Sequence, residues 1–204
     1  MKSMQMLINE MILSGILQDP VIIDTFSSVD RKYFVPESVK EYVYVDAPLA
    51  IGNDQTISQP STVAFMLEKL HVQKGNKILD IGSGSGWTTA LLCQLAGEYG
   101  SVIGLERVDT LVELGKKNLS HFNVERHCHI RKAGEKLGLP GETFDRILVS
   151  ASATQIPEEL FSQLNVGGML VIPVGNSIYT FKKISETEVK QDESYGFTFV
   201  PLIY

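Results

Sequence analysis

The sequence has few cysteines, no excess of basic residues and no long hydrophobic run, and each absence excludes a class of protein. The two cysteines, Cys93 and Cys128, lie in apolar surroundings and form no Cys-x-x-Cys pair. Neither a zinc knuckle nor a disulfide framework is therefore expected, and a reducing compartment fits. Nothing approaches the roughly 20 apolar residues that a membrane-spanning helix requires. We expect a cytoplasmic protein with no membrane partner.

The charge balance is acidic, because 18 Lys and Arg residues stand against 24 Asp and Glu residues and give a net charge of −6. No basic stretch is dense enough to follow a phosphate backbone, so no nucleic-acid partner is expected. Hydrophobic residues make up 44% of the 204 residues, which excludes global disorder. No linker rich in Pro, Gly or Ser divides the chain, so residues 1–204 are predicted to form one domain.

The hydrophobic pattern changes near residue 76. Before it, apolar residues recur at helical spacing, and Asp19-Pro20 supplies an N-cap followed by proline at the first helical position. Residues 1–75 are therefore predicted to form a helical cap with a loop. After it, short apolar runs alternate with helical stretches, which is typical of a parallel sheet. The expected strands are 77–81, 102–106, 128–132, 144–149 and 169–174, and the clearest helices are 87–96 and 109–121.

The end of the chain differs, because no convincing helix separates residues 178–184 from residues 196–203. These two runs are expected to form an antiparallel pair at the edge of the sheet. The predicted fold is α/β, with a Rossmann-like, mostly parallel sheet, helices on both of its faces and a cofactor-binding core over residues 76–204.

The strongest local motif is Gly82-Ser83-Gly84-Ser85-Gly86, which follows a buried strand and opens a helix. Glycines in such a turn allow positive φ and let a ligand approach the backbone, although a tight turn alone would also explain them. The dinucleotide fingerprint would need glycine at Trp87, so a nicotinamide or flavin cofactor is disfavoured. Glu106 ends the next strand, where a carboxylate can accept hydrogen bonds from both hydroxyls of a ribose. Together with Asp80, these residues resemble S-adenosylmethionine-dependent methyltransferases over residues 77–175.

A second resemblance covers nearly the whole chain. Residues 54–60, Asp-Gln-Thr-Ile-Ser-Gln-Pro, resemble the Gly-Gln-Thr-Ile-Ser-x-Pro segment of the protein-L-isoaspartate O-methyltransferase family, which covers the cofactor and supplies an active-site serine. The match continues, in the family's order, through residues 29–36, 156–160, 167–175 and 199–202. The resemblance makes the loop within residues 1–75 a substrate loop, and it implies a monomeric protein-repair enzyme whose partners are peptides and proteins that contain isoaspartate. Its cofactor would be S-adenosyl-L-methionine, and the methyl group would go to the free α-carboxylate.

The implied chemistry fits the residue types. A carboxylate, whose pKa in a solvent-exposed peptide is about 4, is ionised at neutral pH, so no general base is needed and proximity supplies most of the rate. No metal is expected. The resemblance places the acceptor carboxylate at Ser58, helped by Thr56, although the residues alone favour an N-cap role for Ser58 ahead of Pro60. The cofactor-binding residues that it implies are Ile57, Ser58, Asp80, Gly82, Ser83, Gly84, Ser85, Gly86, Glu106, Ala133 and Gly134.

Three positions depart from the family pattern. Asp54 replaces a glycine. At about 4 Å from an anionic acceptor, its carboxylate would repel that acceptor by about 4 kcal/mol at an effective dielectric of about 20. We therefore expect the Asp54 side chain to point to solvent. Ala133 replaces an aspartate beside the adenine, which weakens cofactor binding unless Glu135 or a backbone carbonyl substitutes. Ile203 stands where a polar residue is frequent.

These departures leave two alternatives open. One is a related carboxyl methyltransferase with a dedicated peptide aspartate or a small acid as its acceptor. The other is a catalytically silent module that binds S-adenosylmethionine. Methylation of adenine in nucleic acid is disfavoured, because Ser150-Ala151-Ser152-Ala153 occupies the place of the Asn/Asp-Pro-Pro-aromatic segment.

Overall fold

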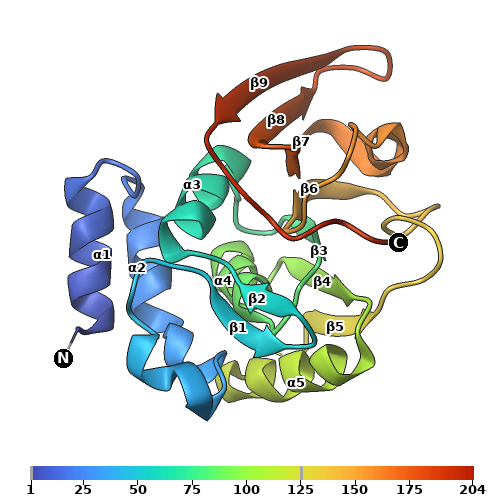
Figure 1. Cartoon of the computed structure of the whole chain (residues 1–204). Coiled ribbons are helices and arrows are strands. Elements are labelled where there is room, and N and C mark those ends of the chain that lie inside the picture. The colour runs from blue at the N-terminus through green and yellow to red at the C-terminus, as the bar shows by residue number, and fades with distance from the viewer. Residues whose placement is uncertain (1, 125) are drawn as a thin grey trace.

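The computed structural model describes residues 2–124 and 126–204, and Figure 1 shows its arrangement. The N-terminal part contains α1 (Met4–Leu13), α2 (Pro20–Ser28), the 3-10 helices η1 (Arg31–Tyr33) and η2 (Glu37–Tyr42), the strands β1 (Leu49–Gly52) and β2 (Gln55–Ile57), and α3 (Pro60–Leu70). The remainder contains β3 (Lys77–Ile81), α4 (Trp87–Ala96), β4 (Ser101–Glu106), α5 (Asp109–Leu119), η3 (Ser120–Phe122), β5 (Cys128–Lys132), β6 (Phe144–Val149), η4 (Glu158–Gln163), β7 (Leu164–Val174), β8 (Ser177–Lys183) and β9 (Val189–Tyr195).

The central sheet has seven strands in the order β5-β4-β3-β6-β7-β8-β9. The pairs from β5 to β7 are parallel, and β8 and β9 are antiparallel to their neighbours. The Rossmann-like sheet that the sequence predicts is therefore confirmed. The chain builds β3, β4 and β5 in one direction and then returns to add β6 on the other side of β3. Such a reversal leaves a crevice at the carboxyl ends of the strands, where ligands bind in sheets of this type.

Successive residues of each strand point to opposite faces of the sheet and enter two separate cores. Ile78 and Val102 belong to the core that contains the buried side chains of the α-helices. Leu79 and Ile103 belong to the other, which is closed by the loop around Leu137 and by η4. Within the described residues, the α-helices thus cover one face, and the second face is covered by a 3-10 helix and loops. No helix in these residues has both the length and the hydrophobicity needed to cross a bilayer.

The antiparallel edge pair exists, but one of its predicted members is wrong. Residues 189–195, as β9, pair with β8, whereas residues 196–203 leave the sheet and run back across its carboxyl edge (Figure 1). There the N–H of Ser152 donates to the carbonyl of Val200, and the N–H of Leu202 donates to the carbonyl of Ser152, both at 2.8 Å. The charged residues of β9 suit an exposed sheet edge, and the apolar residues after it cover the crevice instead.

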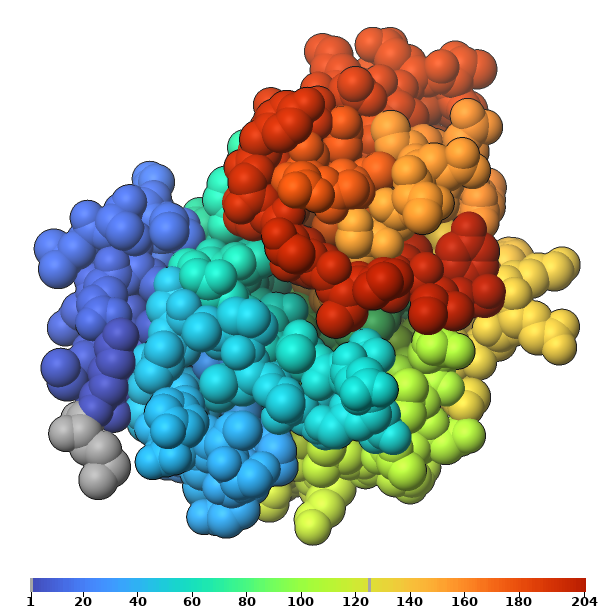
Figure 2. All heavy atoms as spheres, in the orientation of Figure 1, coloured from blue at the N-terminus to red at the C-terminus, as the bar shows by residue number. Residues whose placement is uncertain are grey.

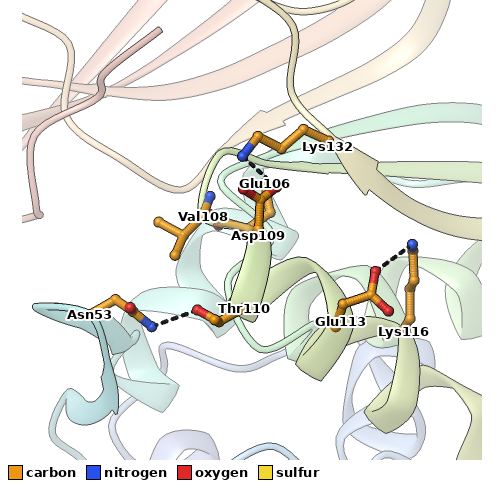
Figure 3. Close-up of polar contacts among 8 residues, drawn as sticks. All are labelled: Asn53, Glu106, Val108, Asp109, Thr110, Glu113, Lys116 and Lys132. Atoms are coloured by element: carbon orange, nitrogen blue, oxygen red, sulfur yellow. Dashed lines mark hydrogen bonds and ion pairs between the residues drawn. The ribbon is translucent and has the colours of Figure 1, made fainter.

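A β1–β2 hairpin occupies part of the predicted substrate loop. Asn53 and Asp54 form its turn with φ of 54° and 56°, the left-handed conformation that two-residue hairpin turns require. The side-chain amide of Asn53 donates to the hydroxyl of Thr110 at 2.9 Å, which ties the tip of the hairpin to α5 (Figure 3). Asp54 is exposed, as the sequence predicts.

Cys93 and Cys128 form a disulfide, which contradicts the expectation that the chain carries no disulfide framework. Cys93 lies on α4 and Cys128 begins β5, and each side chain is 1% exposed. The two residues are 35 positions apart, so only the packing of α4 against the sheet reveals that they meet.

The disulfide should contribute measurably to stability. It closes a loop of 35 residues, and the chain-entropy model assigns such a crosslink about 4 kcal/mol. We expect a reductant to lower the free energy of unfolding by about this amount, measured by denaturant titration. A variant with both cysteines replaced by alanine should not respond to the reductant. Two reactive thiols in the unreduced, denatured protein would contradict this prediction.

Candidate active site

Three adjoining cavities follow the carboxyl edge of β3, β4 and β6. The largest, named here the outer cavity, has a volume of about 440 Å³. The glycine-turn cavity lies between β2 and the turn after β3, and the strand-end cavity lies between the end of β4 and the C-terminal residues. Figure 2 shows the C-terminal segment and the β1–β2 hairpin side by side on this face. Because the three cavities share Thr56, Ser58, Gly82 and Glu106 between neighbours, they form one continuous crevice.

The glycine turn has the conformation that its sequence indicates. Gly82, Gly84 and Gly86 have φ of 82°, 53° and 92°, which L-residues with a side chain rarely adopt. Gly86 has a second role, because a Cβ there would lie 2.9 Å from Cδ1 of Ile130 and 3.1 Å from the carbonyl oxygen of Gly115. Gly86 therefore allows α4 to pack closely against its neighbours, and it does not line the crevice.

Glu106 fastens the glycine turn to the turn after β4. Its carboxylate accepts a hydrogen bond from the N–H of Gly84 at 2.9 Å and another from the N–H of Val108 at 2.8 Å. Figure 3 shows Glu106 beside Val108 at the start of α5. The side chain is only 6% exposed, yet it lines both the glycine-turn and the strand-end cavities. Since a carboxylate offers about four lone-pair sites, it can still accept hydrogen bonds from ligand hydroxyls.

Asp80 lies beneath the turn and is fully buried. One of its oxygens accepts a hydrogen bond from the Thr89 hydroxyl at 2.6 Å, and the other oxygen has no partner among the described residues. Burial raises the pKa of Asp80 to about 7, with the Thr89 hydrogen bond opposing and the Glu106 charge adding to this shift. The buried hydroxyl of Ser83 also lacks a partner in the described chain. Such orphaned polar atoms indicate a bound polar ligand or ordered water nearby.

Ser58 and Thr56 line the outer cavity and also face the glycine turn. The alternative N-cap role of Ser58 is wrong, because the N-cap of α3 is Gln59 and makes no side-chain capping bond. The carboxylate of Asp46 performs that task instead, accepting from the N–H of Ser61 at 2.8 Å. The Ser58 hydroxyl has no hydrogen-bond partner within residues 2–124 and 126–204 and is free to meet a ligand.

The remaining predicted residues divide between the crevice and its surroundings. Ile57 lines the glycine-turn cavity and Ala133 the strand-end cavity, whereas Gly134 lines none of the three. Glu135 also lies outside the strand-end cavity. Ile203 lines that cavity with apolar neighbours.

Sequence reasoning missed several lining residues. Ser150 and Ala151 follow β6 and face the glycine turn, and their place at the carboxyl end of a strand beside the chain reversal was a usable signal. Val200 and Leu202 reach the crevice only because the C-terminal segment crosses it. Nothing in their local pattern indicates this position.

The cofactor that suits this crevice has a ribose with free hydroxyls and no pyrophosphate. Glu106 offers acceptor sites for the hydroxyls, and Trp87, 1% exposed, takes the position where a pyrophosphate-binding turn needs its third glycine. Asp80 and Ser83 keep polar atoms beside the turn that have no partner in the described part of the chain. The fold and the crevice thus define the class of the protein, an S-adenosylmethionine-dependent methyltransferase.

Comparison with known proteins narrows the class to one family. Residues 2–204 match the family model described as Protein-L-isoaspartate(D-aspartate) O-methyltransferase, and the chain belongs to this family. A protein-L-isoaspartate O-methyltransferase of Methanococcus maripaludis is 38% identical over 199 residues, which are 96% of this chain and 93% of the relative. One from Thermococcus onnurineus is 39% identical over 195 residues, or 93% and 88% of the two chains.

A solved structure agrees with these relatives. The protein-L-isoaspartate O-methyltransferase of Plasmodium falciparum, in complex with S-adenosyl-L-homocysteine, has a TM-score of 0.90 and 27% sequence identity. The alignment covers 100% of this chain and 99% of that one. The fold is therefore shared over its whole length.

Replacing Glu106 should weaken cofactor binding. In Glu106→Gln an amide N–H₂ would face one of the two backbone N–H donors, and hydrogen bonds to a charged group are worth about 1.5–3 kcal/mol. We expect affinity for S-adenosyl-L-homocysteine to fall by about tenfold or more, measured by titration calorimetry. Glu113→Gln is the matched control, because Glu113 pairs with Lys116 on the exposed side of α5 (Figure 3). Unchanged affinity of Glu106→Gln would contradict the prediction.

Asp80 should make stability depend on pH. Its pKa of about 7 exceeds that of an unfolded aspartate, about 3.9. Between these two pH values the native state therefore binds one proton more than the unfolded state. The resulting contribution to the free energy of unfolding is fully present below about pH 4 and is lost as the pH rises through about 7. As the pH rises from about 4 to about 8, the free energy of unfolding of Asp80→Asn should increase by as much as about 4 kcal/mol relative to that of the wild type. Denaturant unfolding of the ligand-free proteins checks this, and a constant difference across pH would refute it.

Proposed function

We propose that this protein transfers a methyl group from S-adenosyl-L-methionine to the free α-carboxylate of L-isoaspartyl residues in damaged proteins and peptides. A carboxylate oxygen forms the new bond to the methyl carbon, the carbon–sulfur bond breaks, and the products are a methyl ester and S-adenosyl-L-homocysteine. One observation carries the proposal: an open cavity large enough for a peptide segment meets the cofactor crevice at Thr56 and Ser58.

The lining of the outer cavity suits an anionic acceptor. Hydroxyls and amides contribute its polar groups, and among the described residues no acidic side chain lines it. The exposed Asp54 lies outside it. An acceptor carboxylate therefore meets hydrogen-bond donors and no repelling charge.

This geometry supports the following residue roles. The free hydroxyl of Ser58 donates to one acceptor oxygen, and Thr56 supplies a second hydroxyl at the same junction. Glu106 would hold the ribose, while the turn of residues 82–86, with Asp80 below it and Ile57 above it, would bound the rest of the cofactor. When bound, the cofactor supplies a methyl group on a positively charged sulfur. Because the acceptor is already ionised, the protein needs only to align it, and alignment alone can supply about 7–11 kcal/mol.

We also propose one domain over residues 1–204, with the cap and substrate loop in residues 1–75 and the core in residues 76–204. Side chains of both parts share one hydrophobic core, which supports this proposal.

We propose further that the protein is a monomer without a nucleic-acid partner. The edge strand β9 carries charged residues, which disfavour pairing with the sheet of another molecule. The net charge of −6 disfavours a nucleic-acid partner. The cytoplasmic location stays a prediction. The disulfide counts against it, because disulfides are rare in cytosolic proteins.

A pair of peptides tests the function. A peptide that contains isoaspartate should yield a base-labile methyl ester with labelled cofactor, and the matching aspartyl peptide should not. Ester formation on a different acid would favour the dedicated carboxyl methyltransferase, and cofactor binding without transfer to any acid would favour the silent module.

Replacing Ser58 tests the acceptor site. Ser58→Ala should lower kcat by about 10- to 100-fold, because it removes a hydrogen bond to a charged group. Affinity for S-adenosyl-L-homocysteine should change less, measured by calorimetry. Ser120→Ala is the control, since the Ser120 hydroxyl bonds the carbonyl of Lys117 on an exposed surface. Loss of cofactor affinity without loss of kcat would place Ser58 in cofactor binding instead.

A further inference from the structure

Arg31 is a completely buried arginine behind the outer cavity. Its side chain is 0% exposed, and it forms no ion pair within the described residues. One terminal nitrogen donates to the carbonyls of Val43 at 2.9 Å and Val45 at 3.3 Å. The other donates to the carbonyls of Ala47 at 3.0 Å and Ser58 at 2.9 Å. A single guanidinium thus joins two segments of the chain.

Burial of this charge is unfavourable unless the surrounding dipoles compensate it. Burial lowers the pKa of Arg31 to about 10, and the nearby charge of Asp46 opposes the shift. The four carbonyls and the Trp87 ring, whose centroid lies 5.4 Å from the guanidinium carbon, provide the compensation. The carbonyls thus satisfy both terminal nitrogens of the guanidinium, while its Nε has no partner among the described residues. A lysine, with a single terminal nitrogen, cannot reproduce this arrangement.

Two of the four bonded carbonyls lie at or next to the lining of the outer cavity. Ala47 directly precedes Pro48, which lines the cavity, and Ser58 lines it itself. Asp46, in the same segment as Ala47, accepts from the N–H of Ser61 and from the side-chain amide of Gln59. Arg31 itself lines none of the three cavities. It can therefore act on an acceptor only through the backbone that it holds.

We propose that Arg31 is a positioning residue for the acceptor: by holding the carbonyls of Ala47 and Ser58 together, it sets the direction of the Ser58 hydroxyl toward the glycine-turn cavity. The proposal rests on the proposed function, because it concerns the same transfer. Misplacement of a reacting group by about 1 Å can cost about 100-fold in rate, even when the altered residue touches no substrate. Removing the guanidinium should accordingly impair alignment of the acceptor and spare cofactor affinity.

The experiment compares Arg31→Lys and Arg31→Gln with the wild type. For the isoaspartyl peptide we expect kcat to fall by about 100-fold, while the Kd for S-adenosyl-L-homocysteine stays within about threefold. The glutamine variant keeps an amide donor without a buried charge, so it offers a second route if the lysine variant does not fold. Arg146→Lys is the matched control, because Arg146 is also buried and donates to the carbonyls of His71 and Asp145 away from the crevice.

A double variant separates positioning from general stability. If Arg31 acts through Ser58, Arg31→Lys should lower kcat much less in the Ser58→Ala background than in the wild type, because the two changes are coupled. Equal losses in both backgrounds would overturn the proposal, as would a folded Arg31 variant with wild-type kcat. Failure of both Arg31 variants to fold with S-adenosyl-L-homocysteine present would show a structural role and overturn it too. A wild type that methylates no isoaspartyl peptide would instead refute the proposed function.

Discussion

The crevice depends on one carboxylate, that of Glu106, which accepts hydrogen bonds from the backbone of two different turns. The N–H of Gly84 belongs to the turn after β3 and the N–H of Val108 to the turn after β4. Because both donors converge on a single charged and buried group, the two strand ends cannot shift independently. The glycine turn, the start of α5 and the hairpin tip that Asn53 ties to α5 are thereby placed relative to one another.

The two halves of the crevice differ in electrostatic character. On the cofactor side, Asp80 and Glu106 are buried acids, and the charge of Glu106 adds to the burial that raises the pKa of Asp80. On the acceptor side, the lining consists of hydroxyls, amides and apolar rings. This separation is what a transfer from a positively charged donor to an anionic acceptor requires. The buried cation Arg31 lines none of the three cavities, and the backbone carbonyls that accept its hydrogen bonds stabilise its charge.

The sequence predicted the parallel strands well, because buried strands bounded by glycine or acidic residues leave a strong local pattern. It missed β9, whose charged residues resemble a loop, and it assigned residues 196–203 to the sheet because their apolar residues resemble a strand. Those apolar residues cover the crevice instead. The disulfide was missed for a related reason: Cys93 and Cys128 meet through packing of α4 on the sheet, a long-range contact that spacing does not encode.

The sequence by itself determined the glycine turn and the acid that ends β4, because each depends on residue type and local order, whereas the acceptor role of Ser58 was predicted from the family resemblance. Tertiary structure alone decided which residues close the crevice and what supports them. The C-terminal segment, Ser150 and Ala151 reach the site through the strand order. Asp46 replaced Ser58 as the partner of the α3 N-terminus, and Arg31 joined Ala47 to Ser58. The physical reason is that hydrogen bonds between distant segments depend on how the elements pack, and local sequence patterns carry no record of it.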